Sequence, residues 1–466
     1  MDIKDLQESI TSTKNDHSLF EKSKQYSIEY MESISTRPVF PDDSSLADLN
    51  RFNEELQEAP SDPHELLTML HNYGSPATVA QTGGRYFGFV NGNILPSALA
   101  VKWLADTWDQ NPALYIISPI VAQLEMVCEK WLVELLGLPD ETAAGFVSGS
   151  STATLCGLAA GRDSLLAGKG WDAQERGLIG APNIKVVAGA QAHATVFKAL
   201  SLLGLGRDRA FLVPADDQGC IIPEKIPELD DSTLLILQAG NVNSGGFDAF
   251  EDLCAKARAA GAWTHVDGAF GLWAACSCDT KHLTRGIELA DSWSLDAHKT
   301  LNAPYDCGIV LCKSRDALIS SMQASGSYIQ YSDNRDSMLY TPEMSRRSRG
   351  VDLWATLKSL GKNGIGALVS GLNQRAVQMA TELESAGFQV LNQVVFNQVL
   401  VACDSDELTI ETLKGIQKSG ECWAGGAKWL GKDVIRLSIC SWATTSEDIK
   451  RSVQAFILAR ANALTK

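Results

Sequence analysis

A lysine that directly follows an apolar stretch is the most reactive candidate in this sequence. The segment SLDAHKTLNAPYDCGIVLCK predicts a strand that runs into Asp296, Ala297, His298 and Lys299, then a proline turn and a second strand. Lysine is rarely buried without a purpose, and α/β proteins place ligands beyond their strand ends. A lysine amine beside a cationic histidine can have a lowered pKa and form an imine with a carbonyl compound. Taken alone, however, the His-Lys pair is typical of a surface loop.

An aspartate ends a second apolar segment, AWTHVDGAFG, at Asp267. A buried carboxylate needs a partner. The pyridinium nitrogen of pyridoxal 5'-phosphate (PLP) is such a partner, because an aspartate there keeps the ring protonated and electron-withdrawing. A lone aspartate would more often cap a helix or join an ion pair.

Two predicted strand-to-helix junctions supply the remaining candidates. In FVSGSSTATLCGLAAGRD a strand leads through Ser150 and Ser151 into an amphipathic helix. The backbone N–H groups of such a helix start bind anions such as a cofactor phosphate, although the same residues also form ordinary N-caps. No Walker A lysine follows, which disfavours a nucleotide. His193 falls at a comparable junction, where it would stack on a flat cofactor ring or serve as a structural histidine.

Apolar segments alternate with helical patterns from residue 83 to about 355. Strands are expected in AGFVSGS, IKVVAGA, TLLILQAG, WTHVDGA, SWSLDAH and CGIVLCK, and helices over residues 120–136, 152–166, 194–203 and 250–260. Strands that alternate with helices form mostly parallel sheets. We therefore expect an α/β domain with a mostly parallel central sheet and helices on both faces.

The 466 residues are too many for one simple core, so further domains are expected on each side of this one. Residues 1–82 are helical and polar, and such a segment would pack on another subunit or on the large domain. Residues 356–466 contain a helix, the strands FQVLNQVVFNQVLVAC and VIRLSICSW, and a final helix from Ser446. This pattern predicts a small α+β C-terminal domain after the large domain, 83–355.

Composition excludes several kinds of partner. The formal charge is -16, which disfavours nucleic acid and anionic membrane surfaces. The N-terminus lacks an apolar signal region, and no run of about 20 apolar residues exists to cross a bilayer. The 11 cysteines show no recurring zinc-type spacing, so no metal is expected. A cytoplasmic protein with a small-molecule substrate is the expectation.

Together the motifs resemble the group II PLP-dependent amino-acid decarboxylases, a fold-type-I family that includes the aromatic-amino-acid, histidine and glutamate decarboxylases. The resemblance runs from about Tyr86 to the C-terminus. It rests on HVDGA and DAHK at their mutual spacing, on ISPIVAQLEMVCEKWL, on SRRSRGVDLW and on IRLSICSW. It implies the fold-type-I transferase fold, PLP as the cofactor, an amino-acid substrate, and a homodimer with active sites at the subunit interface.

The resemblance also implies roles around the cofactor ring. Lys299 would hold PLP as an imine, Asp267 would pair with the pyridine nitrogen, and His193 would stack over the ring. Ala269 would lie against the other face of the ring. The family often places Thr or Ser where this chain has Asn243, so the hydrogen bond to the phenolic oxygen would come from an asparagine or be lost.

The phosphate contacts implied by the resemblance are Ser150, Ser151 and His298. One residue departs from the family pattern, which commonly has Asn-Pro before His-Lys. This chain has Asp296 and Ala297 there. A carboxylate beside a phosphate is unfavourable unless it points away, so Asp296 is assigned no phosphate contact.

The substrate side would be formed by a pocket segment and a mobile lid. The lid is expected over residues 323–349, and a lid tyrosine would protonate the product carbanion. Tyr340 is the leading candidate because it lies nearer the SRRSR motif, and Tyr331 is the alternative. The residues that match the family's pocket segment are Phe89, Val90, Asn91 and Gly92.

Two arginines are further substrate candidates. Arg85, beside the pocket segment, would read a polar or acidic substrate side chain. Arg436, in a predicted strand, would bind a carboxylate, a role that an arginine has in related aminotransferases. A free α-carboxylate is needed for decarboxylation, which disfavours that role for Arg436.

Three activities stay open from the sequence. The first is decarboxylation of an L-amino acid to an amine and carbon dioxide. The second keeps PLP but changes the chemistry, to aldolase or lyase cleavage or to oxidative decarboxylation that yields an aldehyde. The third is a non-enzymatic PLP-fold binding protein, which the joint presence of Lys299, Asp267 and His193 disfavours.

Overall fold

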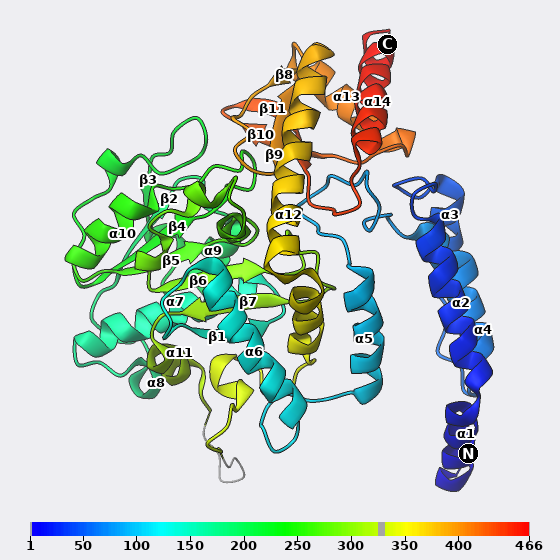
Figure 1. Ribbon diagram of the computed structural model, residues 1–466, viewed down its shortest axis with the longest axis horizontal. Coiled ribbons are helices and arrows are strands. Elements are labelled where there is room, and N and C mark those ends of the chain that lie inside the picture. Colours follow the sequence, from blue (N-terminus) through cyan, green and yellow to red (C-terminus); the bar gives the residue numbers. More distant parts are fainter. Residues whose placement is uncertain (1, 325–330, 466) are drawn as a thin grey trace.

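The computed structural model describes residues 2–324 and 331–465, and a seven-stranded sheet lies at the centre of this part (Figure 1). The strand order is β1-β7-β6-β5-β4-β2-β3. From β6 to β3 all neighbours are parallel, whereas β7 is antiparallel to both β1 and β6. The strands are β1 (Ala143–Val147), β2 (Lys185–Gly189), β3 (Phe211–Val213), β4 (Thr233–Gln238), β5 (Trp263–Asp267), β6 (Ser292–Asp296) and β7 (Gly308–Cys312). The predicted α/β class is confirmed, and β3 is the strand that the sequence did not reveal.

Helices cover both faces of this sheet because successive strand residues point to opposite sides. In β4, Leu235 and Leu237 join the core that contains α6 and α10. Their neighbours Leu234 and Ile236 join the core that contains α7 and α9. The helices of this region are α5 (Pro96–Trp108), α6 (Pro119–Leu136), α7 (Ser150–Gly168), α8 (Ala173–Arg176), α9 (Ala194–Leu202), α10 (Phe250–Ala259) and α11 (Arg315–Met322).

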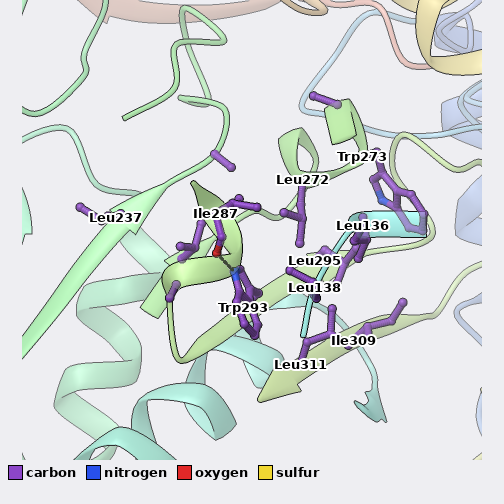
Figure 2. Close-up of a cluster of buried hydrophobic side chains, with 14 of the residues drawn as sticks. Leu136, Leu138, Leu237, Leu272, Trp273, Ile287, Trp293, Leu295, Ile309 and Leu311 are labelled. Atoms are coloured by element: carbon purple, nitrogen blue, oxygen red, sulfur yellow. Dashed lines mark hydrogen bonds between the residues drawn. The ribbon is translucent and has the colours of Figure 1, made fainter. Parts of the chain in front are cut away.

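The core on the α6 side fixes the strands that carry the candidate site. Figure 2 shows Leu295 of β6 beside Ile309 and Leu311 of β7, below the end of α6. Trp293 is fully buried, and its indole nitrogen donates to the carbonyl of Ile287 at 3.0 Å. A buried indole N–H needs such a partner. The bond holds the start of β6 against the loop that precedes it.

A second, antiparallel sheet has the order β10-β11-β9-β8. It packs with α12 (Arg349–Ser385), a long helix that is interrupted at Gly361, where φ is 61°. The predicted boundary between residues 355 and 356 falls inside α12. The other elements are β8 (Gln389–Val390), β9 (Gln398–Ala402), α13 (Asp406–Ser419), β10 (Gly425–Trp429), β11 (Lys432–Ser438) and α14 (Ser446–Leu464). This small sheet with its helices matches the expected α+β fold, although β10 was not predicted.

The N-terminal helices lie at one side of the molecule in Figure 1. Helices α1 to α4 contain no buried residue, so they add little to the core of this chain. No helix in the described part of the chain is long and apolar enough to cross a bilayer. The four helices are α1 (Ile3–Asn15), α2 (His17–Ser33), α3 (Asp43–Asp48) and α4 (Pro63–Met69).

Candidate active site

One edge of the large sheet collects the predicted site residues. Strands β4, β5 and β6 are parallel, so their carboxyl ends meet at this edge, and β5 and β6 end at Asp267 and Asp296. Strand β1 runs the same way, because β7 lies antiparallel between it and β6. Helices α7 and α9 therefore begin at the same edge as these two aspartates. Open α/β sheets bind ligands outside the carboxyl ends of their strands.

Lys299 lies next to the carboxylate that ends β6. Its Nζ is 2.8 Å from Oδ2 of Asp296, whose side chain is 2% exposed. Oδ1 of Asp296 accepts a hydrogen bond of 2.5 Å from the backbone N–H of Ser150, at the start of α7. The carbonyl of Asp296 accepts from the buried indole of Trp273 at 2.9 Å. The strand end is therefore fixed from two sides.

The adjacent His298 is turned toward the same carboxylate. Its Nδ1 accepts a hydrogen bond from the backbone N–H of Cys307 at 3.0 Å, so Nε2 carries the proton in the neutral ring. Nε2 is 3.7 Å from Oδ1 of Asp296. Burial lowers the pKa of His298, and Asp296 opposes that effect. His298 is thus a neutral donor beside the start of α7.

Asp267 and His193 complete what we call the Lys299 cluster, defined as Lys299, Asp296, His298, Asp267 and His193. The buried Asp267 accepts one side-chain hydrogen bond within the described residues, from the N–H of Ala269 at 3.3 Å. Burial raises its pKa, although His193 and Lys299 act in the opposite direction. A buried carboxylate with so few donors has capacity for a further cationic partner.

His193 caps α9 and stays neutral. Its Nδ1 accepts from the backbone N–H of Thr195 at 3.3 Å and lies 2.7 Å from the hydroxyl of the same residue. Burial lowers the pKa of His193, against the effect of Asp267. The cap orients the imidazole, and His193 lines the same small pocket as Asp267.

The predicted pocket segment lies against the backbone of Lys299. The N–H of Gly92 donates to the carbonyl of His298 at 3.2 Å. A Cβ on Gly92 would overlap with the carbonyl of Lys299, so this close approach requires glycine. Phe89 is 61% exposed and stacks on Trp423 with ring centroids 5.9 Å apart. The structure thus joins this segment to the lysine loop.

The two asparagines after β4, Asn241 and Asn243, have different environments. Asn241 is buried, and its Oδ1 accepts from the N–H groups of Asn243 and Ser244. The side-chain amide of Asn243 has no hydrogen-bond partner within the described residues, whereas its backbone N–H donates to Asn241. Of the two asparagines, Asn243 is therefore the one available to a cofactor oxygen.

The structure does not bring Tyr340 to the Lys299 cluster. Tyr340 is buried, its hydroxyl accepts from Arg315 at 2.8 Å, and Arg335 lies over its ring. Tyr331 is exposed and donates to the carbonyl of Ala324. Residues 325–330 of the predicted lid, including a third tyrosine, Tyr328, lie outside the described residues.

The two candidate arginines differ in their placement. Arg85 is buried, and its guanidinium donates to the carbonyls of Glu421 and Ser35 and pairs with Asp448, so the substrate role expected for it is wrong. Arg436 is different. It donates to the carbonyl of Val242, while its buried Nε has no hydrogen-bond partner in the described residues.

One residue that the sequence did not reveal joins the pocket segment to the cluster. Tyr305 stacks on His298 with ring centroids 4.3 Å apart, and its hydroxyl donates to Oδ1 of Asn91 at 3.2 Å. The side-chain nitrogen of Asn91, Nδ2, donates to Oε1 of Gln81. An aromatic residue soon after the lysine loop was the available signal, but its pairing with Asn91 depends on a contact across 214 residues.

These residues fit PLP. A helix N-terminus and the neutral His298 donor suit its phosphate, the under-bonded Asp267 suits its ring nitrogen, and Lys299 suits its aldehyde. The comparison with known families agrees, since residues 48–402 match the pyridoxal-dependent decarboxylase conserved domain. The chain belongs to the pyridoxal-dependent decarboxylase family. This confirms the predicted family, the PLP cofactor and amino-acid decarboxylation as the reaction class.

Individual relatives are distant but span nearly the whole chain. The aromatic-L-amino-acid decarboxylase of Bacillus atrophaeus is 26% identical over 445 residues, which cover 91% of this chain and 90% of the relative. The phenylacetaldehyde synthase of Arabidopsis thaliana is 24% identical over 373 residues, which cover 72% and 74% of the two chains. The crystal structure of Oryza sativa TDC with PLP and tryptamine has a TM-score of 0.87 at 20% identity and covers 100% of this chain and 99% of the other.

Proposed function

We propose that this decarboxylase converts an L-amino acid to its amine and carbon dioxide with Lys299 as the cofactor lysine. The proposal rests mainly on the positions of Asp267 and Lys299 at the ends of two adjacent parallel strands. Among the described residues, Asp267 ends β5 with a single side-chain hydrogen bond, and Lys299 follows the end of the adjacent strand β6. Bound PLP supplies an electron sink for the bond that breaks at the α-carbon.

Side chains and backbone groups of the site would hold the cofactor and polarise its ring. Asp267 would keep the ring nitrogen protonated, and His193 would contact the ring without adding a competing charge. Ser150, Ser151 and His298 would hold the phosphate, Ala269 would contact the ring, and Asn243 would donate to its phenolic oxygen. These assignments rest on the motif match and on the common sheet edge that the residues share.

The direct test is an amino-acid panel scored for carbon dioxide and amine. The panel contains aromatic, acidic and small polar L-amino acids, each with the D-enantiomer as its matched control. We expect PLP-dependent release of carbon dioxide and an equal amount of amine from at least one L-amino acid. Absence of both products from every member, with PLP bound, contradicts the proposed function.

Arg436 supports an acidic or otherwise carboxylate-rich member of that panel. The buried Nε has no hydrogen-bond partner among the residues that the structure describes, and burial lowers the pKa of the guanidinium. A buried guanidinium that is short of acceptors is an appropriate partner for a carboxylate. Arg436→Gln should raise KM for such a substrate by about tenfold, the effect of one lost charged contact. An unchanged KM places the arginine outside the substrate site.

We also propose that the chain works as a homodimer. Apolar side chains are exposed on the N-terminal helices and near α5 and α6, where a stable monomer would hide them. A groove of about 600 Å³ lies between these two parts. Sedimentation should give twice the 50.3 kDa chain mass. A 50.3 kDa particle with full activity contradicts the proposal. The exposed residues are Ile3, Ile10, Phe20, Met31, Trp103, Leu104, Trp108, Ile116 and Ile117.

An aldehyde-forming reaction is the second candidate, supported by the likeness to the phenylacetaldehyde synthase. The two reactions differ in whether the α-carbon is protonated before oxygen reacts with it, and a lid tyrosine would supply the proton. Tyr328→Phe and Tyr331→Phe should each be scored for amine, aldehyde and peroxide. We expect one of them to shift products toward aldehyde, with Tyr340→Phe as the buried control. A shift in Tyr340→Phe alone would restore the original assignment.

A further inference from the structure

The start of α7 is already occupied by a carboxylate of this chain. Asp296 is 1% exposed, and its Oδ1 accepts from the N–H of Ser150 at 2.5 Å. The helix has no side-chain cap of its own, because its N-cap is Gly149. Helix N-termini carry partial positive charge and unpaired N–H groups. Asp296 therefore meets the need for an anion at the place where the cofactor phosphate is assigned.

The same carboxylate also holds the reactive amine. Oδ2 of Asp296 lies 2.8 Å from Nζ of Lys299, within the buried Lys299 cluster. Two parts of the cofactor, its phosphate and its aldehyde, must therefore reach two groups that Asp296 contacts. A second anion at this place would meet like-charge repulsion in a region of low dielectric constant.

We propose that Asp296 is an internal substitute for the phosphate: it stabilises the cofactor-free chain and must move away from α7 and Lys299 when PLP binds. The proposal rests on the PLP assignment above. Its consequence is a pair of opposite effects. Removing the charge weakens the free chain and strengthens its affinity for PLP and for inorganic phosphate. If the carboxylate had only a structural role, its removal would destabilise both the free and the PLP-loaded chain.

Asp296→Asn is the main test, because asparagine keeps the shape and an acceptor oxygen for Ser150. We expect the melting temperature of the PLP-free variant to fall below that of the wild type. Its dissociation constant for PLP, from the visible absorbance band, should fall roughly tenfold, the change that one charged contact makes. Inorganic phosphate at millimolar concentration should raise the melting temperature of the variant more than that of the wild type.

Asp291→Asn is the matched control. Asp291 precedes the same strand β6 at its other end, where its carboxylate accepts from the N–H of Thr264 at 2.8 Å. This change should lower the melting temperature and leave both affinities unchanged. If Asp296→Asn does not fold, Asp296→Ser removes the same charge with a smaller side chain.

The outcomes separate this proposal from the assignment of the cofactor. Equal or weaker PLP binding by the charge-free variants overturns the role of Asp296, while the PLP site stands. No PLP band in the wild type or in any Asp296 variant overturns both. Tighter PLP and phosphate binding together with a less stable free chain supports the proposal.

Discussion

Two charge clusters in the large domain differ in how their buried carboxylates are paired. The carboxylate–guanidinium cluster, made of Glu125, Glu129, Arg315, Arg335 and Arg346, gives all four carboxylate oxygens a guanidinium partner. In the Lys299 cluster, the carboxylate of Asp267 has a single N–H donor within the part of the chain that the structure describes. The carboxylates of the first cluster are thus paired within the chain, although Nε and Nη1 of Arg346 have no hydrogen-bond partner in the described residues. The carboxylate of Asp267 in the Lys299 cluster has no guanidinium partner there.

The pKa shifts show the same difference. Burial acts to raise the pKa of Glu129, but Arg335, the N–H of Ala144 and Arg315 outweigh it, and the pKa is lowered. For Asp267 burial prevails over His193 and Lys299, and the pKa is raised. A carboxyl group with a raised pKa in a cleft is a candidate functional group. The cationic ring of a bound cofactor would supply the additional positive partner that stabilises the ionised carboxylate of Asp267.

Lys299→Ala should have the largest effect on activity. It removes the amine that holds the cofactor and is expected to abolish turnover, because no other lysine belongs to the cluster. Absorbance before and after borohydride, with mapping of the modified peptide, shows whether the wild type holds PLP at this residue. Circular dichroism should show a folded variant. Retained turnover would contradict the assignment of Lys299.

Glu125→Gln tests the carboxylate–guanidinium cluster. Glu125 is fully buried between Arg335 and Arg346. Loss of its charge removes the carboxylate partner of Arg346, while Arg335 keeps Glu129. Removal of one partner from a buried ion pair costs about 3–5 kcal/mol in free energy of unfolding. Denaturant unfolding measures this, with PLP affinity of the folded fraction unchanged. Loss of PLP binding without loss of stability would reverse the roles of the two clusters.

The contrast also explains what the sequence could and could not reveal. Strands and their ends were readable because buried parallel strands form short apolar runs, so Asp267 was predicted at the end of one strand and Lys299 just beyond the end of another. The burial of Tyr340 was not readable. Its ring packs under Arg335 and its hydroxyl bonds Arg315, and both contacts depend on how the segment after α11 folds back onto α6.

Short and long-range features explain the other differences. Strand β3 has three residues at a sheet edge, too few for a pattern. Arg85 lies beside the pocket segment in sequence, yet its partner Asp448 is 363 residues away. Asp296 was set aside as a phosphate ligand because of its charge, and its pairing with Ser150 joins two segments 146 residues apart. Each of these depends on tertiary contacts that local patterns do not contain.

Asp267→Asn should act in opposite directions on stability and activity. Since the folded chain raises the pKa of this carboxyl, the stabilising contribution is present below the ordinary value of 3.8 and is lost as pH rises. At pH 7 the cofactor-free variant should therefore melt at a higher temperature than the wild type. Turnover should fall about 100-fold or more, as when one preorganised charge is removed. A lower melting temperature of the variant at pH 7 would show that the Asp267 carboxylate is well partnered in the cofactor-free chain, which contradicts this interpretation.

The smallest expected effect concerns a buried histidine that lies between the sheet and α7 but outside the Lys299 cluster. Burial lowers the pKa of His265 from 6.5 to about 3, and its Nδ1 lies 2.9 Å from the hydroxyl of Ser292. The folded chain therefore binds no proton at His265 at moderate pH, whereas the unfolded chain does so below about pH 6.5. Its contribution to stability is present above that pH and is lost as pH falls.

Between pH 7.5 and 5.5 this loss should reach about 1.4 kcal/mol for the single proton. The measurement is denaturant unfolding of the cofactor-free chain at several pH values, with His265→Asn compared with the wild type at each. The difference in slope between the two proteins isolates this proton from those of His193 and His298, whose pKa values are also lowered by burial. Equal slopes would mean that His265 is protonated in the folded chain, and that α7 rests on a charged residue rather than a neutral one.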